Sequence, residues 1–453
     1  MTNRLSGDAL AAALGAQLGG TVLNLRRLSG GASRVTSAFE LLASDAPARS
    51  LIVQMDRSDA GADSAVKVQL ERTLLEAAQR AGVPVPAVVA MGVGDELGAS
   101  WLVVQRLEGE TIPRKLLRDA EWDGPRRALT AQCGAALAAI HTIDPGDIDG
   151  LPSADPLGDP LSYLDHLDEV RPALELGARW LASNRLPAGP AVTVHGDYRM
   201  GNFLVGPDGL RAVLDWELAH AGDPAEDIGW LCAPAWRFGG SGEVGGFGAL
   251  DELLEAYAGA GGDSLSRARV HWWQVYATVK WAVICALQAS VHLSGSTRSV
   301  ELAAIGRRVC ESEWDLLALL GVAPAGPAPE PAAKGSVTAP FGRPTAAELV
   351  EAVREYLETA IMERSEGAPR FEARVARNVL AMAEREFLYG PDIAAAHVRR
   401  LHDLGVGDDR TLVAAIRAGD FDDGWEPVAA ALADAARDQL LVANPSYLSG
   451  TSA

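Results

Sequence analysis

The sequence predicts an α+β protein that has two lobes followed by a small all-α domain. Residues 1–107 contain strand-like runs around one helical segment, which is typical of a sheet lobe. Helical patterns dominate residues 108–321, which form the predicted second lobe. Residues 344–453 contain amphipathic segments that indicate a separate helical bundle. Residues 322–343 are rich in Pro and Ala and predict a linker before this bundle.

The elements of the first lobe follow from alternation and from helical spacing. A helix is predicted over about 65–81, and Gly82-Val83-Pro84 ends it. An earlier amphipathic helix is capped at Ser6. The predicted strands are 21–26, 37–42, 51–55, 85–93 and 101–107.

The later elements are helical, apart from a strand–loop–strand insertion over 192–216. After the linker, Thr345 and Glu348 have the spacing of a capping box, which predicts the start of a helix. Together with this helix, the remaining segments predict a bundle of four or five helices. These segments are 371–387, 392–404, 411–418 and 427–441.

Composition excludes several classes of partner. The 453 residues include 60 Asp and Glu against 40 Lys and Arg, a formal net charge of −20. Such a charge repels nucleic-acid phosphates, and there is no Lys/Arg cluster, so no nucleic-acid partner is expected. No apolar run approaches the ~20 residues of a membrane helix, so no membrane partner is expected. The four widely spaced cysteines indicate reduced thiols and a cytoplasmic location.

Three polar clusters carry most of the functional information. Residues 194–205 read VHGDYRMGNFLV, residues 212–217 read AVLDWE, and residues 222–229 read GDPAEDIG. Apolar strand residues flank the first two clusters, as in a hairpin. The polar side chains therefore fall on strand ends and loops, where functional sites are usually built.

These residue types suit phosphoryl transfer. That reaction needs a carboxylate that accepts the proton of the attacking hydroxyl, and Asp197 fits this role. It also needs oxygen ligands that hold Mg²⁺ against the nucleotide phosphates. Asn202 and Asp215 fit this second role, because Mg²⁺ prefers hard oxygen ligands.

At these residues the chain resembles the aminoglycoside phosphotransferase and choline kinase family, through His-x-Asp-x-x-x-x-Asn and the following Leu-Asp-x-Glu strand. The resemblance implies a protein-kinase-like two-lobed fold that uses ATP and Mg²⁺ to phosphorylate a small-molecule hydroxyl. It implies roles for six residues: Asp197 as the base, Asn202 and Asp215 as magnesium ligands, His195 and Asp227 as braces of the loop, and Glu217 beside the metal.

The resemblance also implies a nucleotide site in the first lobe. Gly30, Gly31 and Ser33 would form the turn that covers the phosphates. The backbone from Gln105 to Leu107 would form the hinge that meets adenine.

One position of the predicted nucleotide site departs from the family. Glu71 would pair with a strand cation near position 54, but the chain has Gln54 there. Gln can donate a hydrogen bond to phosphate but brings no charge. Either the cation is displaced, with Arg57 as one candidate, or nucleotide binding is weakened.

A wider match concerns the acceptor. Residues 20–320 resemble the kinase domain fused to certain acyl-CoA dehydrogenases, which implies a hydroxyacyl-CoA or a related hydroxy acid as acceptor. Arg199 and Arg237 would then contact an acidic substrate, although structural salt bridges explain them equally well.

Two other functions stay open. One is phosphorylation of an aminoglycoside or an amino alcohol. The other is a nucleotide-binding pseudokinase, which Gln54 supports. The tail resembles a helical domain of unknown function found beside such kinases, and a protein partner could dock on it.

Overall fold

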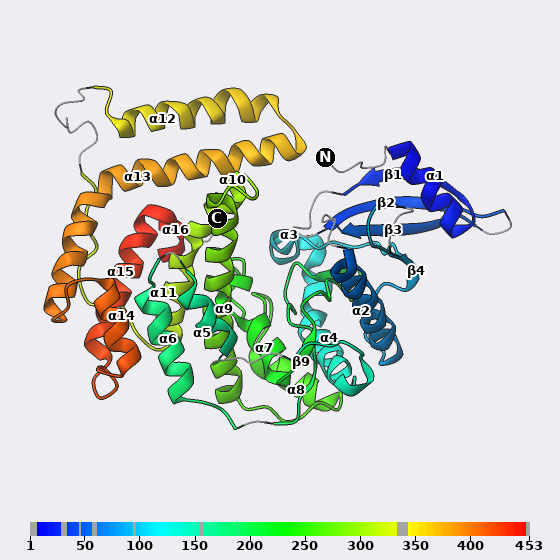
Figure 1. Ribbon diagram of the computed structural model, residues 1–453, viewed down its shortest axis with the longest axis horizontal. Coiled ribbons are helices and arrows are strands. Elements are labelled where there is room, and N and C mark those ends of the chain that lie inside the picture. Colours follow the sequence, from blue (N-terminus) through cyan, green and yellow to red (C-terminus); the bar gives the residue numbers. More distant parts are fainter. Residues whose placement is uncertain are drawn as a thin grey trace. The chain divides into compact units, whose positions relative to one another are not determined.

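The computed structural model describes residues 7–28, 34–44, 47–56, 61–93, 97–153, 158–167, 169–187, 189–332 and 343–449. The chain forms two compact units. The first contains residues 1–154, 188–232 and 236–270, and the second contains residues 155–187, 233–235 and 271–453. These units group the residues differently from the domains expected above, whose boundaries stay a prediction. Figure 1 shows both units.

The first unit contains a five-stranded antiparallel sheet in the order β1-β2-β3-β5-β4. Each predicted strand of the first lobe forms, with small shifts at its ends. The strands are β1 (Thr21–Arg27), β2 (Arg34–Leu42), β3 (Arg49–Asp56), β4 (Val88–Gly92) and β5 (Trp101–Gln105).

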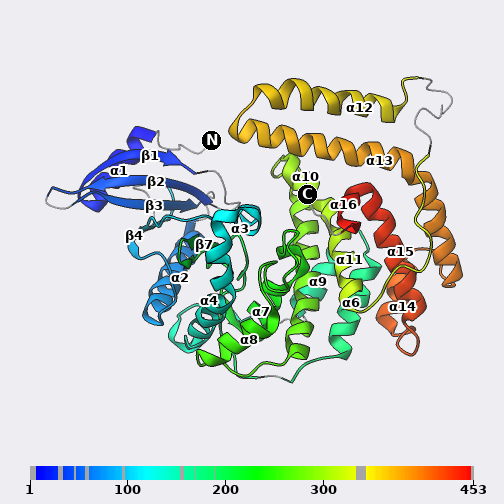
Figure 2. The same cartoon turned by 180° about the vertical axis from the view of Figure 1, so that it is seen from behind.

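The two faces of this sheet are covered by different helices. Alternation along β3 places Leu51 and Val53 in one apolar cluster, which also contains Leu14 of α1 (Gly7–Leu18). Ile52 faces the opposite side and packs in the cluster that contains Leu74 of α2 (Gly61–Arg80). Gln54 follows Ile52 by two residues and therefore lies on the α2 face. Figure 2 shows the sheet and α2 from behind.

The rest of the first unit carries the polar clusters on short strands and helices. The predicted insertion forms a hairpin of β7 and β8, while β6 pairs with β9. The elements are α3 (Pro113–Arg118), α4 (Asp123–His141), β6 (Val192–Val194), β7 (Phe203–Gly206), β8 (Gly209–Val213), β9 (His220–Gly222), α7 (Pro224–Cys232) and α8 (Leu250–Gly259).

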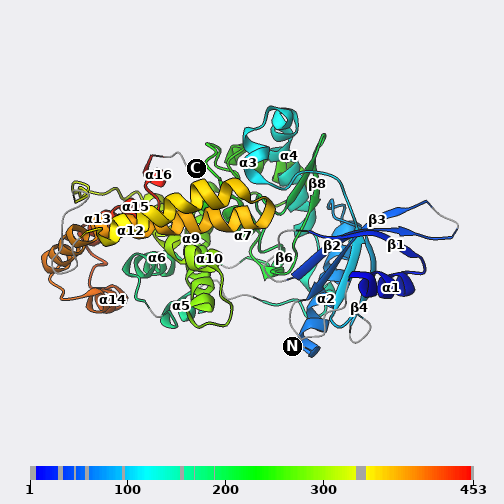
Figure 3. The same cartoon turned by 90° about the horizontal axis from the view of Figure 1, so that it is seen from above.

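The second unit is helical in its described residues. The helices are α5 (Gly158–Asp165), α6 (Pro172–Ser183), α9 (Arg267–Leu293), α10 (Val300–Ile305), α11 (Val309–Leu319), α12 (Ala346–Tyr356), α13 (Gly367–Asp403), α14 (Asp409–Ala418), α15 (Glu426–Ala443) and α16 (Pro445–Leu448). The helices α12 and α13 lie side by side (Figure 3).

The tail confirms one local prediction and corrects another. Thr345 and Glu348 form the predicted capping box at the start of α12. The predicted break between 387 and 392 is wrong, because α13 continues through Pro391. Proline in a helix removes one backbone hydrogen bond and favours a bend. The helix does bend along its length (Figure 1).

The linker is fixed at two points within the described residues. The Gly326 N–H donates to the Asp434 carboxylate on α15, and Arg437 donates to the Gly326 carbonyl. The Ala332 N–H donates to the Leu388 carbonyl of α13.

No described helix is long and apolar enough to cross a membrane. The four cysteines are buried free thiols, as predicted.

Candidate active site

The loop between β6 and β7 requires glycine at Gly196. This residue has φ +77°, and a Cβ there would clash with the Leu218 carbonyl oxygen. Gly201, near the other end of the loop, has φ +105°. These conformations strain other residues, so the two glycines allow the chain to turn sharply directly before Asp197 and directly before Asn202.

Asp227, at the start of α7, holds the first turn of this loop. Its carboxylate accepts hydrogen bonds from the N–H groups of His195 (2.7 Å) and Gly196 (2.9 Å). Burial raises the pKa of Asp227, but the hydrogen bond and charge of His141, 3.4 Å away, outweigh burial and lower it overall. Asp227 is therefore an ionised, fully buried anchor for the loop.

The His195 ring connects the loop to the end of β8. Its Nδ1 accepts the Asp197 N–H (3.2 Å), so Nε2 carries the proton and donates to the Leu214 carbonyl (3.1 Å). Burial lowers the pKa of His195 despite the nearby carboxylates, which favours the neutral ring that this pairing requires. His195 thereby links the backbone of Asp197 to the residue that precedes Asp215.

The Asp197 carboxylate receives three hydrogen bonds. Its Oδ1 accepts from Arg199 Nε and from Trp230 Nε1, both at 2.8 Å. Its Oδ2 accepts from Asn202 Nδ2 at 2.6 Å. A carboxylate has about four acceptor positions, so one remains on Oδ2. A further hydroxyl donor would therefore meet Asp197 at Oδ2.

Asn202 and Asp215 fit a magnesium site by their chemistry. The Asn202 amide nitrogen also donates to the Asp197 carbonyl, so its Oδ1 is the atom suited to a cation. Burial, together with the charges of Glu217, Asp197 and Glu71, raises the pKa of Asp215 to about 6. A divalent cation would compensate this excess of negative charge.

The donor set is also of the right size for magnesium. In the described part of the chain, no three His, Cys, Asp or Glu side chains form a complete metal site. Magnesium is usually bound by only one or two protein carboxylates, with phosphates and water completing its octahedron. One carboxylate, one amide oxygen and a nucleotide therefore suit Mg²⁺ and would not suit a fully protein-bound metal.

The cation that pairs with Glu71 is Arg34, not a residue near position 54. Arg34 Nη1 and Glu71 Oε2 form an ion pair, and both residues are buried. Thr36 lies opposite Gln54, and Arg34 lies two residues from Thr36 on the same face of the sheet. The cation therefore lies on the neighbouring strand β2, diagonally across from Gln54, and not at position 54 of β3. The charge of Glu217 also acts on Arg34.

The backbone N–H groups of the predicted hinge differ in their hydrogen bonds. The Gln105 N–H donates to the Ala87 carbonyl (2.8 Å), and the Arg106 N–H donates to the Ser50 carbonyl (3.0 Å). The Leu107 N–H has no backbone partner within the described ranges. Gly30, Gly31, Ser33 and Arg57 lie outside the described residues.

The two arginines considered for substrate contact differ in their surroundings. Arg199 is held by Asp197 and lies 4.3 Å from the centroid of the Trp236 ring. Arg237 Nη2 donates to the Cys232 carbonyl, and its buried Nε has no hydrogen-bond partner among the described residues. Of the two explanations for Arg199, substrate contact and a structural salt bridge, the structure contains the salt bridge.

Three residues of the site escape motif-based prediction: Arg34, His141 and Trp230. His141 contributes through Asp227, whose carboxylate lies 3.4 Å from its Nε2. Trp230 follows Asp227 by three residues on α7, so both side chains share a helix face that meets the loop. This three-residue spacing from Asp227 is the sequence feature from which a contact of Trp230 with the loop could have been predicted. Arg34 follows Gly30 and Gly31 in the sequence, and its pairing with Glu71 depends on the register of strand β2.

The relatives that match parts of this chain include two acyl-CoA dehydrogenase family members. Acyl-CoA dehydrogenase family member 10 of Mus musculus is 29% identical over 197 residues, which are 41% of this chain and 18% of the relative. Acyl-CoA dehydrogenase family member 11 of Gallus gallus is 40% identical over 62 residues, 13% of this chain and 8% of the relative. The chain thus spans less than a fifth of either relative.

Solved structures share the fold. A protein from Ralstonia eutropha assigned to the aminoglycoside phosphotransferases has a TM-score of 0.54 at 20% identity, covering 70% of this chain and 99% of that protein. A choline/ethanolamine kinase family protein from Mesorhizobium loti has a TM-score of 0.47 at 21% identity, covering 69% and 94%. The first confirms the predicted kinase-like α+β fold.

Two family profiles match the sequence. Residues 363–447 match a domain of unknown function (DUF6285), which confirms the predicted extra helical domain. Residues 24–273, more than half of the chain, match the phosphotransferase enzyme family. This second match contains the buried loop with Asp197 and Asn202, Asp215 just after β8, and the Arg34–Glu71 pair. The chain therefore belongs to the phosphotransferase enzyme family.

Proposed function

We propose that this phosphotransferase transfers the terminal phosphoryl group of ATP to a hydroxyl of a small acidic molecule, with a hydroxyacyl-CoA or a related hydroxy acid as the acceptor class. The observation that carries the proposal is the arrangement around Asp197. Its Oδ2 lies 2.6 Å from the amide nitrogen of Asn202 and has one further acceptor position. The charges of Asp197 and Glu217 both act on Asp215, so these carboxylates belong to the same site.

In this proposal Asp197 accepts the proton of the acceptor hydroxyl at Oδ2. The hydroxyl oxygen forms a bond to the terminal phosphorus, and the bond from that phosphorus to the oxygen of ADP breaks. Arg199 and Trp230 hold the other carboxylate oxygen, so the reactive one has a single orientation. Orientation of this kind supplies much of the rate in phosphoryl transfer, where the protein mainly positions charge.

Asn202 and Asp215 would hold Mg²⁺, which when bound neutralises charge on the nucleotide phosphates. Glu217 lies close enough to influence Asp215 electrostatically and would act beside the metal. His195 and Asp227 keep the loop in position through their hydrogen bonds. These roles agree with the raised pKa of Asp215, since a cation would favour its ionised form.

For the nucleotide, Arg34 would supply the cation that Gln54 lacks. Glu71 holds the guanidinium on the α2 face of the sheet. The Leu107 N–H is the hinge donor suited to adenine.

The acceptor class rests on two supports. The names of the two relatives associate them with acyl-CoA dehydrogenases, and the part of the mouse relative that matches this chain is 197 residues. Arg237 has a buried Nε without a hydrogen-bond partner among the described residues, so it could meet an acidic group.

A nucleotide-binding pseudokinase is the second candidate, and Gln54 favours it. The Arg34–Glu71 pair weakens this reading, because a cation is present on the adjoining strand. Release of ADP should be measured with hydroxyacyl-CoAs, aminoglycosides and amino alcohols in parallel, and the phosphorylated product identified by mass spectrometry. Turnover with hydroxyacyl-CoAs alone supports the proposal. Turnover only with amino compounds refutes the acceptor class, and ATP binding without turnover supports a pseudokinase.

A further inference from the structure

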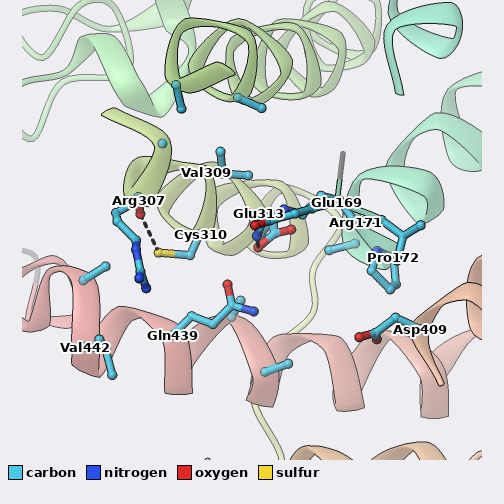
Figure 4. A pocket seen from close by; sticks show the side chains of 18 of the residues that line it. Glu169, Arg171, Pro172, Arg307, Val309, Cys310, Glu313, Asp409, Gln439 and Val442 are labelled. Atoms are coloured by element: carbon cyan, nitrogen blue, oxygen red, sulfur yellow. Dashed lines mark hydrogen bonds and ion pairs between the residues drawn. The ribbon is translucent and has the colours of Figure 1, made fainter. Parts of the chain in front are cut away.

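The second unit contains a cavity of about 760 Å³ that shares no residue with the Asp197 site. Its wall is formed by the start of α6 and by α9, α11, α13 and α15 (Figure 4). Pockets that bind drug-sized ligands measure about 300–1,000 Å³, so this cavity has room for a small organic molecule. More of its lining is apolar than polar, with residues such as Ala289, Val309 and Val442.

The charged groups named in this wall form ion pairs, and one of these pairs is longer than the others. Four ion pairs have nitrogen–oxygen distances between 2.5 and 3.0 Å. They are Arg171 with Glu169, Arg307 with Glu386, His397 with Asp409, and Arg400 with Asp438. The long pair joins Arg171 to Glu313 of α11, which Figure 4 shows at the cavity.

Glu313 is 4% exposed and accepts no hydrogen bond from any described residue. Its ion pair with Arg171 has a distance of 3.9 Å, beyond hydrogen-bond range, and Arg171 is already bonded to Glu169. A buried carboxylate without hydrogen bonds is unfavourable unless a partner satisfies it. Burial accordingly raises the pKa of Glu313, and the charge of Arg171 opposes this only in part.

We propose that this cavity binds an organic cation, in which a protonated amine pairs with Glu313 and an apolar body fills the space between α9, α11 and α15. The apolar wall favours a ligand with a hydrocarbon part. An anion would meet Glu313 with like charge. A neutral ligand would add no charge beside the carboxylate, whose ion pair with Arg171 is 3.9 Å long. The exposed amide of Gln439 lies on α15 at the same cavity and offers a second polar contact (Figure 4).

Three probes with one hydrocarbon body test the charge preference: phenylpropylamine, phenylpropanol and phenylpropanoate. Their binding to the full chain at neutral pH, without ATP, can be measured by isothermal titration calorimetry and by saturation-transfer NMR. Phenylpropylamine should bind at least about tenfold more tightly than the alcohol, and the acid should bind least. Because no ATP is present, the result does not depend on phosphotransferase activity.

A matched pair of variants assigns the binding to Glu313. Glu313→Gln keeps the shape of the side chain and removes its charge, so it should weaken amine binding at least about tenfold and leave alcohol binding unchanged. Glu386→Gln removes a carboxylate of the same cavity that is exposed and paired with Arg307, so it should change amine binding by less than about twofold.

The proposal fails if none of the three probes binds, if the alcohol or the acid binds as tightly as the amine, or if Glu313→Gln leaves amine affinity unchanged. Equal losses in the Glu313 and Glu386 variants would also overturn it, since that result would indicate general surface charge. If Glu313→Gln does not fold, the comparison of the three probes on the wild-type chain still decides the charge preference.

Discussion

Arg34 and Glu71 form a buried ion pair that joins the start of β2 to α2. The pair brings a fixed positive charge to the sheet face that Gln54 leaves uncharged. Arg34 also experiences the charges of Glu217 and Asp56, so it belongs to the electrostatics of the site and not only to the packing of α2. Under the proposed function, Arg34 would offer this charge to the nucleotide phosphates.

We expect Arg34→Met to raise the KM for ATP and to lower kcat/KM by about a hundredfold or more, because a cation beside the phosphates is lost. Arg26→Met, on exposed β1, is the matched control and should leave kcat/KM unchanged. Steady-state kinetics with varied ATP measure both.

The same substitution leaves Glu71 buried without its cation, which costs about 3–5 kcal/mol of unfolding free energy. The double variant Arg34→Met/Glu71→Gln should recover much of this stability, as measured by denaturant unfolding, and should still bind ATP weakly. A folded double variant with wild-type KM for ATP would exclude Arg34 as the nucleotide cation.

Asp197→Asn should lower kcat by about 10²–10⁴-fold, because general base catalysis is lost. Nucleotide affinity should change little, since Asp197 contacts the hydroxyl and not ATP. Asp208→Asn, at the exposed turn between β7 and β8, is the control. Turnover near the wild-type rate in Asp197→Asn would remove Asp197 from the role of base.

Trp230→Phe should lower kcat about tenfold without changing the KM for ATP, because it removes one of the three hydrogen bonds that orient Asp197. Trp122→Phe is matched to it, since the buried Trp122 Nε1 has no hydrogen-bond partner among the described residues. That control should retain full activity. An equal loss in both variants would mean that packing, and not the hydrogen bond to Asp197, explains the effect.

Asp215→Asn should raise the Mg²⁺ concentration needed for half-maximal activity at least about tenfold, because a carboxylate ligand is replaced by a neutral amide. Magnesium titrations at saturating ATP measure this value. Restoration of activity at high Mg²⁺ would distinguish a metal ligand from a residue needed only for folding. A variant with the wild-type magnesium requirement would contradict the assignment.

Asp227→Asn should reduce the unfolding free energy by about 1.5–3 kcal/mol near neutral pH, because two backbone N–H groups lose an ionised acceptor. The pKa of Asp227 is lower in the folded chain than in the unfolded chain, where it is near 3.9. The ionised form therefore stabilises the fold above about pH 4, and this stabilisation is lost as the pH falls through the folded pKa.

The difference in unfolding free energy between wild type and Asp227→Asn should thus be constant from neutral pH down to about pH 5 and should shrink below about pH 4. Denaturant unfolding across this range measures it. Asp149→Asn, at an exposed position, should show no such dependence. A difference that grows at low pH would mean that the sign of the pKa shift is wrong.

Local sequence determined much of this protein. The spacing from His195 to Asn202 predicted a loop that gathers Asp197 and Asn202, and two glycines with positive φ let it turn. Apolar alternation predicted the five strands of the sheet, and Thr345 predicted the start of α12. These features depend on the side chains and backbone preferences of residues a few positions apart. They can therefore be predicted without knowledge of the rest of the chain.

Tertiary structure decided the contacts between distant residues. Strand register, not motif spacing, brings Arg34 to Glu71 in place of a cation at 54. The packing of α7 against the catalytic loop brings Trp230 to Asp197, and helices of the second unit enclose Glu313. Such contacts depend on the packing of whole elements and not on local preference. The continuation of α13 through the exposed Pro391 also departs from the local preference of proline.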